Sequence, residues 1–328
     1  MRASKIVSFS IVILLITILF TGAVTVPAAA QSDMMMFRYN AQHTGDYSPV
    51  AGNNTSKGLL TWSFTTGNTV FSSPAVVNGV IYVGSYDNNV YAINATTGAK
   101  LWSFTTGNYV LSSPAVVNGV VYVGSDDNNT YAINATTGAK LWSFTTGNYV
   151  LSSPAVANGV VYVGSDDNNT YALNATTGAK LWNYTTGNAV LSSPAVVNGT
   201  VYVGSYDSNI YALNATTGTK LWNYTTGGDV YSSPAVANGT VYVGSSDNNV
   251  YALNATTGKV TWSFTTGDYV LSSPAVSNGE VYVGSVDGNI YAIGNAAAAT
   301  SQGTTPGFDV ILAFFGLVIA AYVVRRRS

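Results

Sequence analysis

A repeat of 40 residues runs through the central part of this chain and limits the folds that it can adopt. A Trp and the tetrapeptide Tyr-Val-Gly-Ser each return at this interval, with no insertion or deletion between copies. A fixed period of this length is typical of propellers and solenoids, in which each unit packs mainly against its neighbours. The tryptophans are Trp62, Trp102, Trp142, Trp182, Trp222 and Trp262.

Each repeat holds four short segments with the composition of β-strands. In residues 114–147 these segments are PAVVNG, VVYVGS, YAINA and KLWSFTTG. Asn-Gly between the first two is a strong hairpin signal, and SDDNN and NATTG supply the other turns. Val, Tyr, Trp, Phe and Thr favour strands, and nothing in the repeat follows the period of a helix. Four strands per repeat predict an all-β fold with one propeller blade per repeat.

The repeats predict a closed ring of six four-stranded blades over residues 59–293. Their order is offset, because the first Trp-bearing segment, Leu59 to Thr66, precedes its companions and the last three strands, Pro274 to Ile293, have none after them. We therefore expect the N-terminal strand to join the last blade. This closure removes a free sheet edge, which folded proteins avoid.

The segment from Ala92 to Trp102 indicates what the repeated residues do. Asn94 suits a turn because its side chain can bond the nearby backbone, and Gly98 suits a positive φ. Trp102 is expected to fill the gap between adjacent blades. We expect the same structural roles for the six tryptophans and for Gly98, Gly138, Gly178, Gly218 and Gly258.

This segment resembles the PQQ-like β-propeller repeat, whose motif is Ala-x-Asp-x-x-Thr-Gly-x-x-x-Trp. Ala92, Thr97, Gly98 and Trp102 match the motif, and the resemblance covers roughly residues 36–293, including the segment MFRYNAQHTG. The resemblance implies a propeller. It leaves activity open, because the same repeat builds quinone-dependent dehydrogenases and non-enzymatic scaffolds, such as outer-membrane-assembly lipoproteins.

The chain departs from the family motif at the Asp, where Asn stands instead. The change creates Asn-Ala-Thr, an N-glycosylation triplet, and low charge with many such triplets suits an external surface covered by sugars. The candidate glycosylation sites are Asn94, Asn134, Asn174, Asn214, Asn254, Asn198 and Asn238.

The N-terminal end has the composition of a processing signal. A basic start, an apolar stretch and small residues around Ala28 and Ala30 predict a secretory signal peptide over residues 1–30. An uncleaved membrane helix is the alternative. Residues 31–58 form a lead-in segment before the propeller.

The C-terminal end contains a small polar linker, residues 294–305, and a tail, residues 306–328. The tail begins with Pro306, Gly307 and Phe308 and continues with an apolar run and an Arg cluster. It resembles the PGF-type sorting signal of archaeal surface proteins, which implies an archaeal source, cleavage near the triplet and lipid attachment. A plain membrane-spanning anchor is the alternative. We expect a hydrophobic helix at each chain end and a body held on the outer face of the cell membrane.

Few residues are suited to catalysis or to holding a cofactor. The chain has no Cys, and His43 is its only His. Arg38 is the only Arg of the mature body and Glu280 its only Glu. The innermost strand, with the sequence SSPAV, offers no base. We therefore predict no catalytic residue, no metal centre and no quinone cofactor. A quinone-linked oxidoreductase or a polysaccharide-acting enzyme is the alternative.

Aspartates recur in the turn that follows Tyr-Val-Gly-Ser. Turn formation is their expected role. A ring of weak Ca²⁺ ligands, helped by Asp126 and Asp166, is the alternative, although the spaced acidic loop of a calcium hand is missing. The turn aspartates are Asp87, Asp127, Asp167, Asp207, Asp247 and Asp287.

The copies differ most at two places that share one face of the predicted propeller, after the Thr-Thr-Gly turn and after Tyr-Val-Gly-Ser. Because Tyr is enriched at interfaces, we predict a binding face there. Neutral drift at solvated loops is the alternative. The candidate residues are Tyr86, Tyr109, Tyr149, Tyr206, Asp229 and Tyr269.

The sequence thus predicts a secreted, membrane-tethered propeller that acts as a binding or scaffold module without catalysis. A surface protein or a glycan is the expected partner. The net charge of −2 argues against nucleic acid. A structural glycoprotein of the cell coat is a further alternative.

Overall fold

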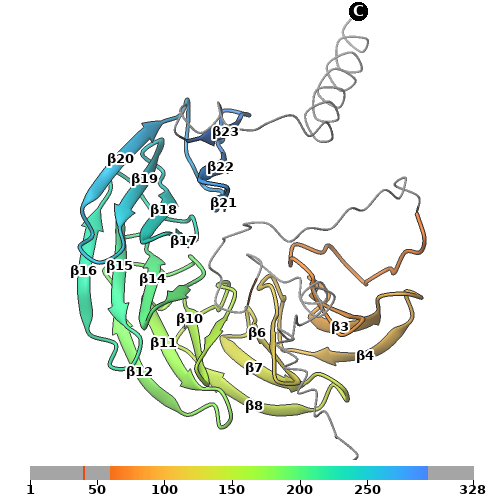
Figure 1. Ribbon diagram of the computed structural model, residues 1–328. Helices are drawn as coiled ribbons and strands as arrows, with labels where there is room; N and C mark the ends of the chain where they lie inside the picture. Colours follow the sequence, from red (N-terminus) through yellow and green to blue (C-terminus); the bar gives the residue numbers. More distant parts are fainter. Residues whose placement is uncertain (1–39, 41–59, 295–328) are drawn as a thin grey trace, which may run out of the picture.

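The computed structural model describes residue 40 and residues 60–294, and these residues form an all-β structure. Small antiparallel sheets follow one another in chain order along an arc (Figure 1). The described residues contain no helix long and apolar enough to cross a membrane. The predicted signal peptide, lead-in segment, sorting motif and terminal helices lie outside the described residues, apart from Asn40 of the lead-in.

The strands of the first three sheets have closely matched bounds. The first comprises β1 (Ala75–Val77), β2 (Val80–Gly84), β3 (Asn89–Asn94) and β4 (Lys100–Thr105). The second comprises β5 (Ala115–Val117), β6 (Val120–Gly124), β7 (Asn129–Asn134) and β8 (Lys140–Thr145). The third comprises β9 (Ala155–Ala157), β10 (Val160–Gly164), β11 (Asn169–Asn174) and β12 (Lys180–Thr185).

The remaining three sheets repeat the pattern until the last strand. The fourth comprises β13 (Ala195–Val197), β14 (Thr200–Gly204), β15 (Asn209–Asn214) and β16 (Lys220–Thr225). The fifth comprises β17 (Ala235–Ala237), β18 (Thr240–Gly244), β19 (Asn249–Asn254) and β20 (Val260–Thr265). The sixth comprises β21 (Ala275–Ser277), β22 (Glu280–Gly284) and β23 (Ile290–Ile293). The prediction of an all-β fold built from six propeller blades is confirmed.

The hairpins form where the turn residues were expected. Asn118 and Gly119 both have positive φ, 50° and 75°, and join β5 to β6 in a two-residue turn. This backbone matches the twist of the flanking strands and suits Asn and Gly. The turn between β7 and β8 is held by Asn134, whose Oδ1 accepts the N–H groups of Thr136 and Thr137 at 3.0 and 2.9 Å.

Each outer strand contains a β-bulge. In the second sheet Ala132 pairs with Trp142, but the next residue, Ile133, pairs with Lys140. Leu141 is therefore the extra residue of the outer strand. Its side chain is 51% exposed, and Leu101, Leu181 and Leu221 in the same bulge are exposed to the same degree.

The Trp of each outer strand connects one blade to the next. Trp102 of the first sheet donates its indole N–H to the Ala135 carbonyl of the second sheet at 2.9 Å. A Cβ added to Gly138 would lie 2.8 Å from the Trp102 ring, so only Gly allows the ring to lie this close. The contact between Trp and Gly recurs at the next three junctions, where Trp142, Trp182 and Trp222 pack on Gly178, Gly218 and Gly258. The position equivalent to these glycines after the sixth blade is Ala298, so Trp262 has no matching Gly.

The inner strands are connected by a row of serine hydrogen bonds. The backbone N–H of Ser113 donates to the hydroxyl of Ser153, the equivalent residue one blade later, at 2.9 Å. The bond recurs from Ser73 to Ser113, from Ser153 to Ser193, from Ser193 to Ser233 and from Ser233 to Ser273. These five bonds run across every junction from the first blade to the sixth.

The ends of the arc differ from the prediction. The sixth sheet has three strands, and residues 60–66 form no strand and do not pair with β23. Trp62 instead donates to Ala95 of the first blade at 3.0 Å and packs on Gly98, as every other Trp packs on the blade that follows it. The side chain of Trp62 thus attaches residues 60–66 to the first blade. The predicted backbone pairing with β23 would form only if the sixth blade also lay against this segment.

Both ends expose apolar side chains that are covered elsewhere. Ile290 of β23 is 84% exposed, while Val90 and Val250 at the same position are fully buried. Val70, which precedes the first inner strand, is 45% exposed, while Val110 is fully buried. Joining the two ends would cover these surfaces, so burial of apolar area favours closure.

A disulfide tests closure directly because the chain has no Cys of its own. In the fifth sheet Thr265 pairs with Asn249, and their side chains bond at 2.6 Å. By the same register a closed ring places Thr65 opposite Asn289, within the Cα separation of about 4.4–6.8 Å that a disulfide needs. We expect the double variant Thr65→Cys, Asn289→Cys to form an intramolecular disulfide on mild oxidation, as seen by mass spectrometry under non-reducing conditions.

The matched control is the pair Thr265→Cys, Asn249→Cys, which is already adjacent and forms its disulfide whether or not the ring closes. If the control oxidises while the pair at residues 65 and 289 stays reduced or forms only dimers, the closed ring is wrong.

The role of Gly138 is tested by comparison with Gly119. Both have positive φ, 72° and 75°, but a Cβ at Gly119 would meet nothing within 4 Å. Gly138→Ala therefore adds a clash with Trp102 to the backbone strain that both variants share. We expect it to lower the free energy of unfolding by about 2 kcal/mol more than Gly119→Ala, measured by urea unfolding. Equal losses in the two variants would show that the Trp contact does not need Gly.

Candidate functional site

The propeller has two faces with different loops. On one face, the turn between the second and third strands meets the loop that enters the next blade. Asp126 donates its N–H to the carbonyl of Tyr109 at 2.9 Å, and Val150 donates to Ser125 at 3.1 Å. We call this surface, made of the turns at 85–88 and the loops at 106–112 and their copies, the Tyr/Asp face.

The opposite surface, which we call the Asn-Gly face, is made of the Asn-Gly turns at 78–79, the turns at 95–99 and their copies. The two kinds of turn meet there, because Ala95 donates its N–H to the Gly79 carbonyl at 2.8 Å and Ala135 donates to Gly119 at 2.8 Å.

The recurring aspartates of the Tyr/Asp face are bound within the protein. Oδ2 of Asp207 accepts the Gly187 N–H at 2.7 Å and the hydroxyl of Tyr211 at 2.6 Å, and Oδ1 accepts the Asn209 N–H at 3.0 Å. Partial burial pushes the pKa of Asp207 upward, but the hydrogen bonds from Tyr211, Gly187 and Asn209 outweigh it and hold that pKa below its usual value.

The turn aspartates therefore hold the loops in place, as the turn prediction requires. The alternative of a calcium ring is not favoured, since their oxygens already accept hydrogen bonds from protein donors. Within residue 40 and residues 60–294, no group of three or more His, Cys, Asp or Glu lies close enough to hold a metal ion.

Asp126 and Asp166 stand in a different environment from the turn aspartates. Burial, and then the charges of Asp127 and Asp166, raise the pKa of Asp126 to about 6. Its Oδ1 is buried and has no hydrogen-bond partner among the described residues. Asp166 accepts the side-chain N–H of Asn148 at 3.1 Å. These two carboxylates come from adjacent blades on the same face.

Aromatic side chains lie beside these carboxylates. Tyr86 stacks on Tyr109 with ring centres 4.4 Å apart. Tyr109, Tyr149 and Tyr269 are 41%, 45% and 50% exposed. Burial, and to a smaller degree the charges of Tyr231, Asp229 and Asp166, raise the pKa of Tyr206 to about 12. The six candidate residues thus lie on one face, and Tyr86 with Tyr109, and Tyr206 with Asp229, lie close together.

Two further aromatic residues join this face and were missed by the sequence analysis. The ring centre of Phe71 lies 5.2 Å from that of Tyr86, and Tyr231 lies 6.0 Å from Tyr206. They occupy the position that is Leu in the other copies. The replacement of a repeated Leu by an aromatic residue was a signal that the comparison of copies could have used.

Charge is divided between the two faces. All ten described aspartates lie on the Tyr/Asp face, and none of the described lysines does. Four of the five described lysines directly follow turns of the Asn-Gly face, and the fifth is the last residue of its turn. The four are Lys100, Lys140, Lys180 and Lys220, and the fifth is Lys259. Glu280 is the one described acid on that face. Most of the negative charge of the described residues therefore lies on the Tyr/Asp face, and their positive charge lies on the Asn-Gly face.

The serines that precede the inner strands accept hydrogen bonds from the backbone. Ser112 accepts the Gly124 N–H of its own blade at 3.0 Å, and Ser153 accepts the Ser113 N–H of the preceding blade at 2.9 Å. A quinone that carries several carboxylates would need cationic partners near the channel. The described lysines lie on the Asn-Gly face where the chain enters the outer strands, so the described residues do not fit this cofactor.

The candidate glycosylation sites lie on the Asn-Gly face. In Asn134 the described hydrogen bonds use Oδ1, so Nδ2, the atom that glycosylation modifies, makes none within residues 60–294. Asn198 and Asn238 are exposed at hairpin turns, with φ of 49° and 48°. The triplet at Asn128 differs, since Thr130 is fully buried.

The sequence matches the family described as "Outer membrane protein assembly factor BamB", built of PQQ repeats, over residues 48–154, 148–231 and 225–301. These segments cover most of the chain. The chain therefore belongs to this family of PQQ-repeat β-propellers. Residues 305–327 match the PGF-CTERM motif, which marks archaeal proteins anchored at the cell surface by the C-terminus. The comparison with curated proteins gives no significant match.

Solved structures confirm the propeller fold. BamB from Moraxella catarrhalis has a TM-score of 0.50 at 19% identity, covering 72% of this chain and 88% of its own. The quinohemoprotein alcohol dehydrogenase ADHIIG from Pseudomonas putida HK5 has 0.67 at 19%, covering 81% and 58%. The computationally designed protein Ika8 has 0.63 at 17%, covering 68% and 70%. At such identities the likeness shows the fold alone.

The opposite pKa directions of Asp126 and Asp207 predict opposite effects of pH. The raised pKa of Asp126 means that the folded state binds the proton more tightly, so its ionisation costs stability as pH rises from about 4 towards 6. The lowered pKa of Asp207 adds stability above pH 4 that is lost as pH falls. We expect Asp126→Asn to raise the free energy of unfolding at pH 7.5 by about 1 kcal/mol after allowance for solvent screening, and to change it little at pH 4.

Asp207→Asn serves as the control with the opposite sign, because it should lower stability at pH 7.5 more than at pH 4. Urea unfolding of both variants at the two pH values gives the comparison. A loss of stability in Asp126→Asn at pH 7.5 contradicts the burial argument.

Proposed function

We propose that this chain is a binding module of the cell surface, held at the membrane by its C-terminal tail, and that its Tyr/Asp face takes the partner. The observation that carries the proposal is the placement of variation. The copies keep the residues that join blades, Trp and Gly, while differing at residues 86, 109 and their copies, which lie together on one face. Exposed Tyr side chains supply contact area with little loss of side-chain entropy.

The surface location follows from the tail. The PGF-CTERM motif indicates secretion and C-terminal anchoring at the surface of an archaeal cell. A propeller in this position meets proteins and glycans of the envelope and of the medium. The charge of the Tyr/Asp face and its exposed aromatic side chains favour partners that are neutral or positively charged.

A non-catalytic role is supported by the use of the polar groups. The inner serines and the turn aspartates are engaged in hydrogen bonds that hold strands and loops. An oxidoreductase remains the alternative function, since a quinohemoprotein dehydrogenase shares the fold. Titration of the purified protein with pyrroloquinoline quinone and Ca²⁺ separates the two, because a bound quinone changes its absorption spectrum.

Substitution of the exposed tyrosines tests the binding face. We expect the triple variant Tyr109→Ser, Tyr149→Ser, Tyr269→Ser to bind isolated cell envelopes at least about tenfold more weakly than the parent, because exposed aromatics dominate such contacts. The matched control is Ser103→Ala, Ser143→Ala, Ser263→Ala on the outer strands, where the side chains are exposed but lie away from this face.

Saturable binding of labelled full-length protein to envelopes provides the measurement, with circular dichroism to confirm the fold of both triple variants. Unchanged binding by a folded tyrosine variant removes the Tyr/Asp face as the binding site and favours neutral drift of the loops.

A further inference from the structure

The described chain ends on the Asn-Gly face. β23 runs from the turn at 285–288 on the Tyr/Asp face to Ile293, which pairs with Val281 beside the last Asn-Gly turn. A Cβ added to Gly294 would lie 2.9 Å from the side chain of Glu280, the first residue of β22. The tail therefore leaves the propeller from this face and not from the Tyr/Asp face.

The connection to the anchor is short. Ten residues, 295–304, separate Gly294 from the start of the PGF-CTERM match at residue 305. Whatever their conformation, ten residues span at most about 35 Å. The Asn-Gly face is thus the part of the propeller that the tail holds nearest to the lipid, whether the tail stays as a helix or is replaced by a lipid.

The rim of this face carries the positive charge of the described body. The five described lysines are all exposed there, one at or directly after each of the turns at 95–99 and their copies. The amino groups of Lys180 and Lys220 bond Asn183 and Asn223 at 3.2 and 3.0 Å, but these bonds are exposed and can exchange for other acceptors. A row of lysines at a lipid surface is attracted by anionic headgroups within about one Debye length.

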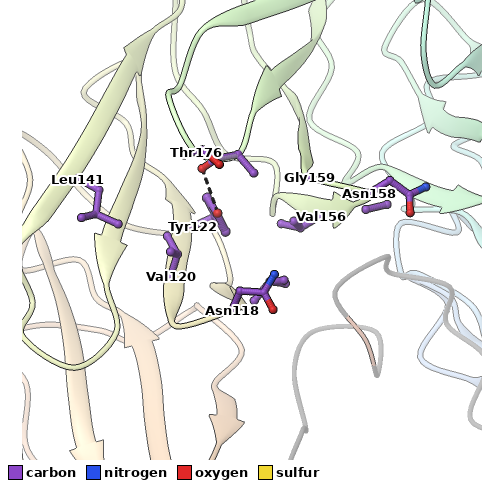
Figure 2. Close-up of a pocket in the computed structure, with 11 residues that line it drawn as sticks. Asn118, Val120, Tyr122, Leu141, Val156, Asn158, Gly159 and Thr176 are labelled. Carbon is purple, nitrogen blue, oxygen red and sulfur yellow. Dashed lines mark hydrogen bonds between the residues drawn. The ribbon is translucent and has the colours of Figure 1, made fainter.

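The same rim carries exposed apolar side chains. The β-bulge turns Leu101, Leu141, Leu181 and Leu221 outward, each next to a lysine and about half exposed. Leu141 lines a groove between the second and third blades, together with Val120, Val156 and Thr176 (Figure 2). A matching groove between the first and second blades includes Leu101. Paired Lys and Leu side chains suit the boundary between headgroups and acyl chains.

We propose that the Asn-Gly face rests on the membrane surface, with its lysines on anionic lipid headgroups and its bulged leucines at the interface. The Tyr/Asp face is then turned away from the membrane, and its carboxylates are repelled by the headgroups that attract the lysines. This orientation rests on one part of the proposed function, the C-terminal anchor, and on the place where the described chain ends. It does not require that the Tyr/Asp face binds a partner.

The orientation has a consequence for glycosylation. Five Asn-Ala-Thr triplets, at Asn94, Asn134, Asn174, Asn214 and Asn254, lie on the Asn-Gly face beside these lysines. A glycan at these positions would hold the face away from the lipid. Direct contact therefore requires that these sites are unoccupied in the anchored protein.

The test uses the full-length protein inserted through its tail into lipid vesicles. The chain has no Cys, so Thr176→Cys on the Asn-Gly face and Tyr149→Cys on the Tyr/Asp face each take one environment-sensitive fluorophore. In vesicles that contain anionic phospholipid, we expect aqueous iodide to quench the label at residue 176 severalfold less than the label at residue 149. The difference should shrink in neutral phosphatidylcholine vesicles, in high salt, and in the variant Lys140→Gln, Lys180→Gln, Lys220→Gln.

Equal quenching at the two positions in anionic vesicles overturns the orientation. A difference that is the same in neutral vesicles and in the Lys variant overturns the headgroup contact, because the tail alone would then account for it. Glycopeptide mass spectrometry of the native protein is an independent check. An occupied site on the Asn-Gly face contradicts direct contact, and unoccupied sites support it. The sites are Asn94, Asn134, Asn174, Asn214 and Asn254, with Asn198 and Asn238 at the hairpin turns of the same face.

Discussion

The contact between the Trp of one blade and the Gly of the next is the interaction on which the rest of this structure depends. Each blade is a small sheet that cannot bury its apolar side chains alone, and packing against the neighbouring blades covers them. The indole of Trp102 covers Gly138 and bonds the Ala135 carbonyl, so it joins two sheets through packing and a hydrogen bond together. Repetition of this contact sets the direction in which one blade follows another.

The contact also accounts for the position of the first Trp, which belongs to none of the six sheets. Trp62 belongs to a segment ahead of β1, yet it packs on Gly98 as the other tryptophans pack on the following blade. In the other blades the segment that carries such a Trp is the outer strand of the preceding sheet. By the same arrangement, the segment with Trp62 belongs to a blade that precedes the first. In a ring, that blade is the sixth. The free edge of β23, the exposed Ile290 and the serine row that ends at Ser273 are the matching features at the other end.

The sequence allowed the blades, their turns and the tryptophan contacts to be predicted, because each depends on residues within one repeat or on a fixed spacing. Other features depend on how strands pair and how loops meet. The outward position of Leu141 follows from a shift in register between β7 and β8, which the repeat alone does not reveal. The hydrogen bond from the Gly187 N–H to Asp207 joins two loops that are 20 residues apart in the chain. Because this carboxylate accepts a bond from the protein, it holds the loops together, although the sequence also allowed it to be a metal ligand. For Phe71 and Tyr231 the sequence gives only the replacement of a repeated Leu, and their contacts with Tyr86 and Tyr206 depend on how the loops meet.

The two faces of the propeller differ in charge as well as in their loops. The described lysines lie on the Asn-Gly face, where the described chain ends, and the described aspartates lie on the Tyr/Asp face. The central claim is that partners approach the Tyr/Asp face from outside the cell. Cross-linking on intact cells with a carboxylate-directed reagent and a lysine-directed reagent tests it most directly. The account predicts that cross-links to other molecules map to Asp126, Asp166 and Asp229, while cross-links to other proteins at Lys100, Lys140 and Lys180 are rare. Partner cross-links concentrated at the lysines, with none at the aspartates, would contradict it.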